Sequence, residues 1–236
     1  MNEAATHFGW FWWTAAAVSF LLGSTPFGVL IARSKGVDIR AVGSGNPGAT
    51  NVGRVLGKRF GIACFFLDAC KGAAPVLIAG WLAGVLGSGA AEMNAAAAWG
   101  WLLVAIAAIL GHCFSPLLGF RGGKGVATGF GAVVSMWPVL TIPALVGFAI
   151  WGGVLLVTRT MSLASLAGAI VLPVMVFVMA VLPGTPSASL AGSIPFLVVT
   201  LAVAGLIVFR HRSNLAGLRA ARRVGSALLE IGRAHV

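Results

Sequence analysis

Three short polar segments interrupt a sequence that is otherwise strongly apolar, and their residue types suit the binding of phosphate groups. The first segment, Gly43–Arg54, combines glycines with serine, threonine, asparagine and a final arginine. The second, Phe120–Thr128, has two adjacent glycines followed by Lys124 and a further glycine. The third, Arg210–Asn214, carries two arginines and a histidine directly after an apolar stretch.

The second and third segments each allow a plainer interpretation. A glycine-rich turn with a lysine at a helix start is typical of a phosphate cradle, because its backbone N–H groups stay accessible. The segment is not a Walker A loop, since the spacing G-x-x-x-x-G-K-[ST] is absent. Taken alone, it is equally well explained as an ordinary loop. The third segment alone is more typical of a basic cluster that ends a membrane span at the lipid headgroups.

Ionisable side chains also occur within apolar stretches. Asp68 and Lys71 are spaced i and i+3, which places them on one face of a helix. Charged residues at membrane depth are costly and indicate a functional site by default, although a structural ion pair is an equally good interpretation. His112 ends an apolar stretch, where a satisfied interfacial histidine is the plainer alternative to a site residue. The cysteines lack Cys-x-x-Cys spacing, so we expect buried small side chains and no metal site: Cys64, Cys70 and Cys113.

Composition identifies the class of protein that must position these residues. Of the 236 residues, 59% are hydrophobic and only 9% are charged, whereas a soluble domain has about 25% charged residues. This excludes an ordinary soluble globule and, because hydrophobicity is high, a disordered chain. With only three cysteines, a disulfide scaffold is excluded as well. The sequence therefore predicts an all-α, polytopic membrane protein, whose net charge of +11 suits an anionic substrate.

Apolar stretches of about 20 residues predict the membrane spans. The stretch between Lys124 and Arg159 is ambiguous, because Pro138 and Pro143 interrupt it and allow either one tilted helix or two short ones. The clear candidates are Trp10–Ile31, Phe60–Leu86, Ala95–Leu118, Leu163–Leu182 and Ile194–Phe209.

The basic residues decide between one and two crossings in that stretch. They fall in four clusters, and all four lie on one side of the membrane only if the stretch crosses twice. The positive-inside rule favours that arrangement. We therefore predict seven transmembrane helices, with the N-terminus outside and the C-terminus in the cytoplasm.

The polar segments together resemble the cytoplasmic motifs of the bacterial acyl-phosphate:glycerol-3-phosphate acyltransferase family, PlsY. The first two motifs in this order are highly specific. The resemblance runs from about residue 20 to residue 214. It is carried by Ser44–Asn51 followed by Arg54, by Gly111–His112 followed by Phe120–Thr128, by Arg210–Asn214, and by the shorter matches Leu67–Gly72 and Thr158–Ser162.

The resemblance implies a single seven-helix membrane domain, residues 1–214, in the bacterial inner membrane with a cytoplasmic active site. Such an enzyme transfers a fatty acyl group from a long-chain acyl phosphate to the 1-hydroxyl of glycerol 3-phosphate. The products are lysophosphatidic acid, a phospholipid precursor, and phosphate. The resemblance implies no cofactor, no metal and no nucleic-acid partner; the partners are the two substrates and the bilayer.

The resemblance also assigns site residues, most of them within the three motifs. His211 could be the general base, but a phosphate oxygen of the acyl donor could equally take the proton. The implied catalytic residues are Ser44, Arg54, Lys124, His211 and Asn214. The implied substrate-binding residues are Gly45, Asn46, Gly48, Thr50, Asn51, Lys71, His112, Arg121, Gly122, Gly123, Gly125, Ser162, Arg210 and Arg212.

The C-terminal part departs from the family pattern. After Asn214, the chain has Gly217 where the family has arginine, Ala221 for glycine and Arg223 for glutamate. We expect residues 215–236 to form a basic tail, and the last six residues, Ile231–Val236, resemble a translated sequencing adapter rather than native sequence.

The competing function is a transporter for a phosphorylated solute, which the composition and the intramembrane Asp68 and Lys71 would also fit. Against a transporter, no inverted repeat is evident, and the polar motifs gather at one predicted face rather than at the membrane midplane.

Overall fold

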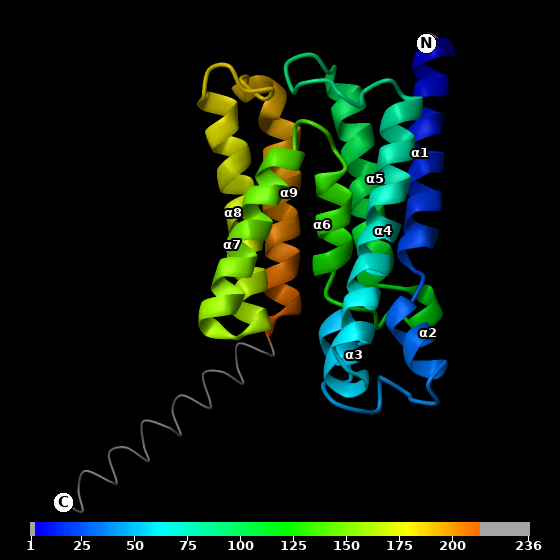
Figure 1. Cartoon of the computed structure of the whole chain (residues 1–236). Helices are drawn as coiled ribbons and strands as arrows, with labels where there is room; N and C mark the ends of the chain where they lie inside the picture. Colours follow the sequence, from blue (N-terminus) through cyan, green and yellow to red (C-terminus); the bar gives the residue numbers. More distant parts are fainter. Residues whose placement is uncertain (1–2, 213–236) are drawn as a thin grey trace, which may run out of the picture.

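The structure, a computed structural model, describes residues 3–212, and within this range every regular element is helical (Figure 1). The predicted all-α class is therefore confirmed for the described chain. Asn214 and the predicted tail, 215–236, lie outside the described residues. The helices are α1 (Glu3–Gly23), α2 (Phe27–Arg33), α3 (Ala49–Leu56), α4 (Lys58–Leu82), α5 (Ala95–Cys113), the short 3₁₀ helix Pro116–Leu118, α6 (Val126–Val134), α7 (Thr141–Thr158), α8 (Met161–Val181) and α9 (Leu190–Arg210).

Six helical segments of the described chain are long and apolar enough to cross a membrane. They are Gly9–Arg33, Lys58–Leu82, Ala95–Leu118, Thr141–Thr158, Met161–Val181 and Leu190–Arg210. The ambiguous stretch does form two helices, α6 and α7, which run in opposite directions (Figure 1). However, α6 has nine residues, about 13 Å of helix, which is less than half of a bilayer core of about 30 Å. A seventh full-length span is therefore not confirmed.

The basic residues gather at one end of the bundle, the lower end in Figure 1. The start of α1 and the end of α9 lie at opposite ends (Figure 1). We call the lower end the basic end, because it carries every described lysine and arginine except Lys71: Arg33, Lys35, Arg40, Arg54, Lys58, Arg59, Arg121, Lys124, Arg159, Arg210 and Arg212.

The first predicted span is broken between α1 and α2, where Pro26 cannot donate a backbone hydrogen bond. Carbonyl groups freed inside a membrane protein need other donors. Ser115 Oγ donates to Ser24 O at 2.7 Å, and Lys71 Nζ donates to Thr25 O at 2.6 Å. Side chains from α4 and from the loop after α5 thus stabilise the break.

Close helix packing brings α6 against α4 near the basic end. Gly72 of α4 lies on the backbone of Thr128, and Gly131 of α6 lies on the backbone of Ala69. A Cβ at either glycine would overlap those backbone atoms. Small residues at helix crossings are typical of membrane bundles, because they allow backbones to approach closely. This contact fixes the start of α6 beside the middle of α4.

Candidate active site

A cavity of about 950 Å³ opens at the basic end, between α3, α4, the start of α6, the α7–α8 turn and the end of α9. Its walls differ in chemistry: one is polar and cationic, and the other is formed by apolar and aromatic side chains of α4 and α7. The predicted site residues that line it are Ser44, Asn46, Gly48, Thr50, Arg54, His112, Lys124, Gly125, Ser162 and His211.

The first motif forms a turn that Asn51 holds together from within. The buried Asn51 accepts a hydrogen bond from Ser44 N at 2.8 Å, and its Nδ2 donates to Ile39 O at 3.1 Å and Val42 O at 3.0 Å. Asn51 does not line the cavity, so the structure gives it a scaffolding contact rather than a substrate contact. Gly45, with φ of +67°, likewise turns the chain outside the cavity.

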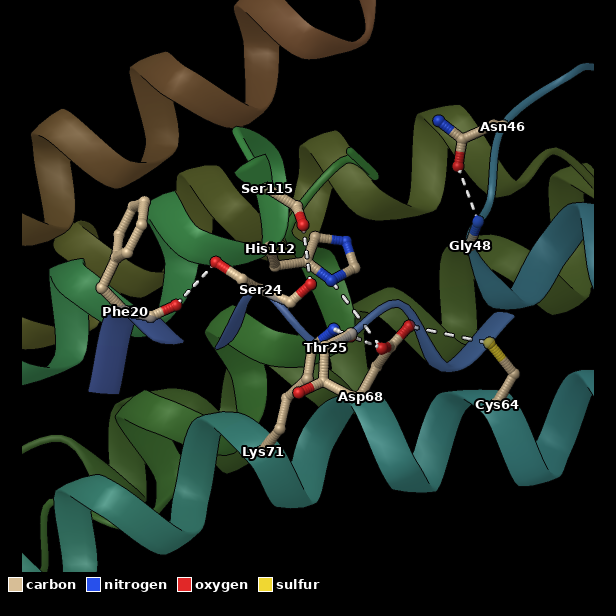
Figure 2. A network of polar contacts seen from close by, with 10 residues as sticks. All are labelled: Phe20, Ser24, Thr25, Asn46, Gly48, Cys64, Asp68, Lys71, His112 and Ser115. Carbon is tan, nitrogen blue, oxygen red and sulfur yellow. Dashed lines mark hydrogen bonds and ion pairs between the residues drawn. The ribbon is translucent and has the colours of Figure 1, made fainter. Parts of the chain in front are cut away.

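A second asparagine shapes the same turn. Asn46 Oδ1 accepts a hydrogen bond from Gly48 N at 2.9 Å (Figure 2). Arg54 follows one helical turn after Asn51, with its Nη1 3.4 Å from Asn51 Oδ1. The turn therefore directs Ser44, Asn46 and Arg54 into the cavity lining together.

The second motif differs from the expected cradle in one respect. The N–H groups of Gly122 and Gly123 donate to Cys113 O and His112 O, each at 3.1 Å. A Cβ at Gly122 would overlap the His112 carbonyl, and a Cβ at Gly123 would overlap the His112 ring. The structure thus explains these two glycines by close packing on the end of α5, and neither lines the cavity.

A backbone geometry that suits an anion lies instead at the start of α6. Gly125, at φ of +81°, precedes the helix, and Val126 and Ala127 begin it; all three line the cavity beside Lys124. The first N–H groups of an α-helix have no intrahelical acceptor, and the helix dipole there favours an anion. Burial, together with the charges of Arg210 and Arg54, lowers the pKa of Lys124. A bound anion would relieve this repulsion.

Arg210 anchors the second motif rather than lining the cavity. Its Nη2 donates to Gly123 O at 2.6 Å, to Gly122 O at 2.8 Å and to Cys113 O at 3.3 Å. One guanidinium thus joins the end of α9 to the loop that precedes α6. Of the other predicted arginines, Arg121 is exposed, and Arg212 stacks on the Phe209 ring at 3.8 Å; neither lines the cavity.

Asp68 lies at the centre of a buried polar network (Figure 2). Its Oδ1 is 2.8 Å from Lys71 Nζ and 3.7 Å from His112 Nδ1, and its Oδ2 accepts from Cys64 Sγ at 3.6 Å. The ammonium of Lys71 is thus committed to Asp68 and Thr25 O, away from the cavity lining. Asp68 fits both interpretations of this pair: it forms a buried ion pair with Lys71, and it lines the cavity beside His112.

His211 has one ring nitrogen that can accept a hydrogen bond from a substrate. Its Nδ1 is 2.8 Å from Ile207 O; because a carbonyl only accepts, Nδ1 carries the proton, and Nε2 of the neutral ring is an acceptor. Burial is the main cause that lowers the pKa of this buried histidine; Lys124 and Arg210 lower it further, and the Ile207 hydrogen bond opposes them. The neutral ring is therefore favoured. Ser162, also buried, lines the same cavity.

Sequence reasoning missed two cations and the apolar wall of the cavity. Lys58 and Arg159 line the cavity but lie outside the three main motifs. The apolar wall contains Phe65, Phe148 and Trp151, with ring centroids 6.3 Å apart for Phe65–Phe148 and 5.2 Å for Phe148–Trp151. Arg159 did carry two signals: it lies within the shorter family match Thr158–Ser162, and it stands alone at the end of an apolar stretch, which also fits the positive-inside rule.

The described chain is a helical membrane protein whose cationic cavity adjoins an apolar wall, an arrangement that suits an amphiphile with an anionic headgroup. Residues 13–221 match the sequence profile of the family described as glycerol-3-phosphate acyltransferase. A glycerol-3-phosphate acyltransferase of Aquifex aeolicus is 40% identical over 197 residues, which cover 84% of this chain and 90% of the relative. One of Pseudomonas aeruginosa is 43% identical over 213 residues, covering 89% and 97%.

Solved structures agree with the sequence relatives. The crystal structure of PlsY, an integral membrane glycerol 3-phosphate acyltransferase, in its glycerol 3-phosphate form has a TM-score of 0.74 at 38% identity, covering 89% of this chain and 93% of that chain. The lysophosphatidic acid form of PlsY gives 0.72 at 37% identity, with the same coverage. The chain belongs to the glycerol-3-phosphate acyltransferase family, which confirms the resemblance seen in its motifs.

Proposed function

We propose that this protein transfers a fatty acyl group from an acyl phosphate to the 1-hydroxyl of glycerol 3-phosphate, yielding lysophosphatidic acid for phospholipid synthesis. The names of the relatives support glycerol 3-phosphate as the acceptor, and the PlsY structures have forms with this substrate and with lysophosphatidic acid. The observation that carries the proposal is that cations, a helix N-terminus and an aromatic wall all line one cavity.

The chemistry requires orientation more than activation. The acceptor hydroxyl oxygen attacks the acyl carbonyl carbon, and the bond from that carbon to the bridging phosphate oxygen breaks. The hydroxyl proton passes to the departing phosphate, so that lysophosphatidic acid and inorganic phosphate are formed. Because phosphate is a good leaving group, the protein need not supply a covalent nucleophile; it must hold the reactants and stabilise developing charge.

The cavity residues divide these tasks. Arg54, Lys124 and the start of α6 compensate phosphate charge, and Ser44 and Ser162 donate or accept hydrogen bonds. His211 Nε2 accepts a hydrogen bond that orients the acceptor hydroxyl, while the phosphate of the donor takes the proton. Asn214 lies outside the described residues, and its expected role in orienting the substrate remains part of the proposal.

The placement in the membrane is part of the proposal. The basic end faces the cytoplasm by the positive-inside rule, which puts the cavity on the cytoplasmic face of the inner membrane and the start of α1 outside. Residues 1–214 then form one membrane domain with seven passes, α6 being a half-length pass.

A labelling experiment tests this orientation. In a cysteine-free background, a cysteine at the exposed Ala188 should react with an impermeant reagent added outside intact cells. A cysteine at the exposed Ser34 should react only after permeabilisation. Labelling of both from the same side would contradict the orientation.

The activity is tested with purified protein, radiolabelled glycerol 3-phosphate and palmitoyl phosphate. We expect labelled lysophosphatidic acid and release of inorganic phosphate in equal amounts. Palmitoyl-CoA, offered as the alternative donor, should give no product. Product from palmitoyl-CoA, with none from palmitoyl phosphate, would overturn the donor assignment. Uptake of labelled glycerol 3-phosphate into proteoliposomes without acylation would instead support the competing transporter.

A further inference from the structure

Two exposed cations line the cavity from different elements. Lys58 is the first residue of α4, and Arg159 immediately follows α7 at the turn into α8. Both line the cavity, together with the motif cations Arg54 and Lys124. The cavity thus holds more positive charge than one phosphate group needs. Lys58 and Arg159 have no role in the acceptor site described above.

The backbone at Arg159 indicates that its side chain is needed. Arg159 has φ of +51° and ends α7, where its N–H donates to Leu155 O at 2.8 Å. Glycine is the usual residue at this position of a helix end, because a Cβ is unfavourable in the left-handed region. An arginine retained there, with its side chain on a cavity, points to a function that outweighs the backbone strain.

The surroundings of these cations match an amphiphile. From Lys58, the same face of α4 continues with Ile62 and Phe66, which are 46% and 61% exposed and also line the cavity. Beside Arg159, the last turn of α7 exposes Leu156 and Val157 by 82% and 86%, as expected of side chains in contact with lipid. The cations therefore lie at headgroup level, where an apolar track begins.

We propose that Lys58 and Arg159 form a clamp for the phosphate of the acyl donor, whose chain runs along Ile62 and Phe66. This inference rests on the proposed function, because it assigns the second of the two phosphates that the reaction brings together. Glycerol 3-phosphate has no chain and binds to the motif cations Arg54 and Lys124. The clamp holds the donor phosphate apart from it and admits a substrate that arrives from the bilayer.

Kinetics with two substrates test the clamp. The variants are Lys58→Met, Arg159→Gly and the double variant, assayed in zwitterionic vesicles that contain phosphatidylcholine only. Glycine suits the backbone at position 159, so Arg159→Gly removes the side chain without new strain. We expect each single variant to raise the KM for palmitoyl phosphate roughly tenfold, the loss of one charge-assisted contact. The KM for glycerol 3-phosphate should stay within about twofold of the wild-type value.

Matched variants separate the clamp from general surface charge. Arg59→Met removes a cation next to Lys58 that is also exposed but does not line the cavity, and it should leave both KM values unchanged. Arg159→Lys should restore most of the donor KM, because it keeps the charge. Equal effects of Arg59→Met and Lys58→Met would overturn the proposal, as would a rise in the KM for glycerol 3-phosphate instead.

Bulk anionic lipid offers the same phosphate chemistry, and the vesicle composition distinguishes it from the donor. If Lys58 and Arg159 bind only lipid headgroups, their variants change the donor KM in vesicles with phosphatidylglycerol but not in phosphatidylcholine; that result overturns the clamp. A wild-type enzyme that makes no product from palmitoyl phosphate refutes the proposed function itself, before any variant is compared.

Discussion

Replacing His211 with glutamine distinguishes a general base from a residue that only orients the substrate. If His211 is the obligatory base, kcat should fall roughly 10²- to 10⁴-fold. If His211 Nε2 only accepts one hydrogen bond, a loss of about 0.5–1.5 kcal/mol corresponds to a fall of roughly 2- to 13-fold. We expect the smaller loss, because with phosphate as leaving group little proton transfer has to precede formation of the C–O bond.

The pH dependence gives an independent measure of the same question. Burial above all lowers the pKa of His211 from 6.5, so the neutral acceptor form predominates at neutral pH and is lost only as the pH falls on the acidic side of 6.5. A phosphate monoester also titrates, at about pH 6. If the donor phosphate takes the proton, the acidic limb of the rate profile should persist in His211→Gln. If His211 is the base, this limb should disappear.

The assay is the initial rate of lysophosphatidic acid formation by purified enzyme, from about pH 5 to pH 9, with both substrates saturating. Binding of glycerol 3-phosphate, measured by calorimetry, must be retained in the variant for the comparison to hold. A loss of about 10³-fold with a flat acidic limb, in a variant that still binds glycerol 3-phosphate, would refute the orienting role.

Three further substitutions test other contacts. Gly123→Ala should lower thermal stability and activity because its Cβ overlaps the His112 ring. Adding His112→Ala should recover the melting temperature but not the activity. An unchanged melting temperature in Gly123→Ala would contradict the packing of Gly123 on His112. Lys71→Met should destabilise the protein by about 3–5 kcal/mol, since it leaves the buried Asp68 carboxylate without its ammonium partner. The double variant with Asp68→Asn should recover most of this loss in a thermal unfolding assay. Lys124→Met should raise the KM for glycerol 3-phosphate roughly 10- to 100-fold, and an unchanged KM in the variant would remove Lys124 from the acceptor site. Because the pKa of Lys124 is lowered, the wild-type KM should begin to rise with pH below 10.5, the ordinary lysine value.

The sequence predicted those features that depend on local composition. Apolar length correctly indicated the helical class, and the basic clusters correctly indicated one basic end and two helices between Lys124 and Arg159. Of the two prolines that left this stretch ambiguous, Pro138 lies between the helices, whereas Pro143 lies in the first turn of α7. The half-length α6 was not predictable from apolarity alone, because its residues are as apolar as those of a full span. Its extent is set by the glycine-rich loop before it and the turn after it.

Roles that depend on contacts between distant residues could not be read from the sequence. Lys71 was expected to bind substrate, but its ammonium meets Thr25 O, 46 positions away. Gly123 looked like a phosphate-loop glycine, although its lack of a side chain accommodates His112 from the preceding helix. Lys58 and Arg159 were missed because single cations at span ends are common, and only the fold brings these two to one cavity.

The tie between Arg210 and the loop before α6 has a consequence for biogenesis. Arg210 follows Gly122 and Gly123 by 88 and 87 positions, so these loop carbonyls have no guanidinium partner until α9 has been made. At a translation rate of about 5–20 residues per second, this interval lasts roughly 4–17 seconds. During synthesis the nascent chain thus inserts most of its described spans before Arg210 can fix the loop that precedes α6. Synthesis of α9 is therefore the step that completes the hydrogen bonds of this loop.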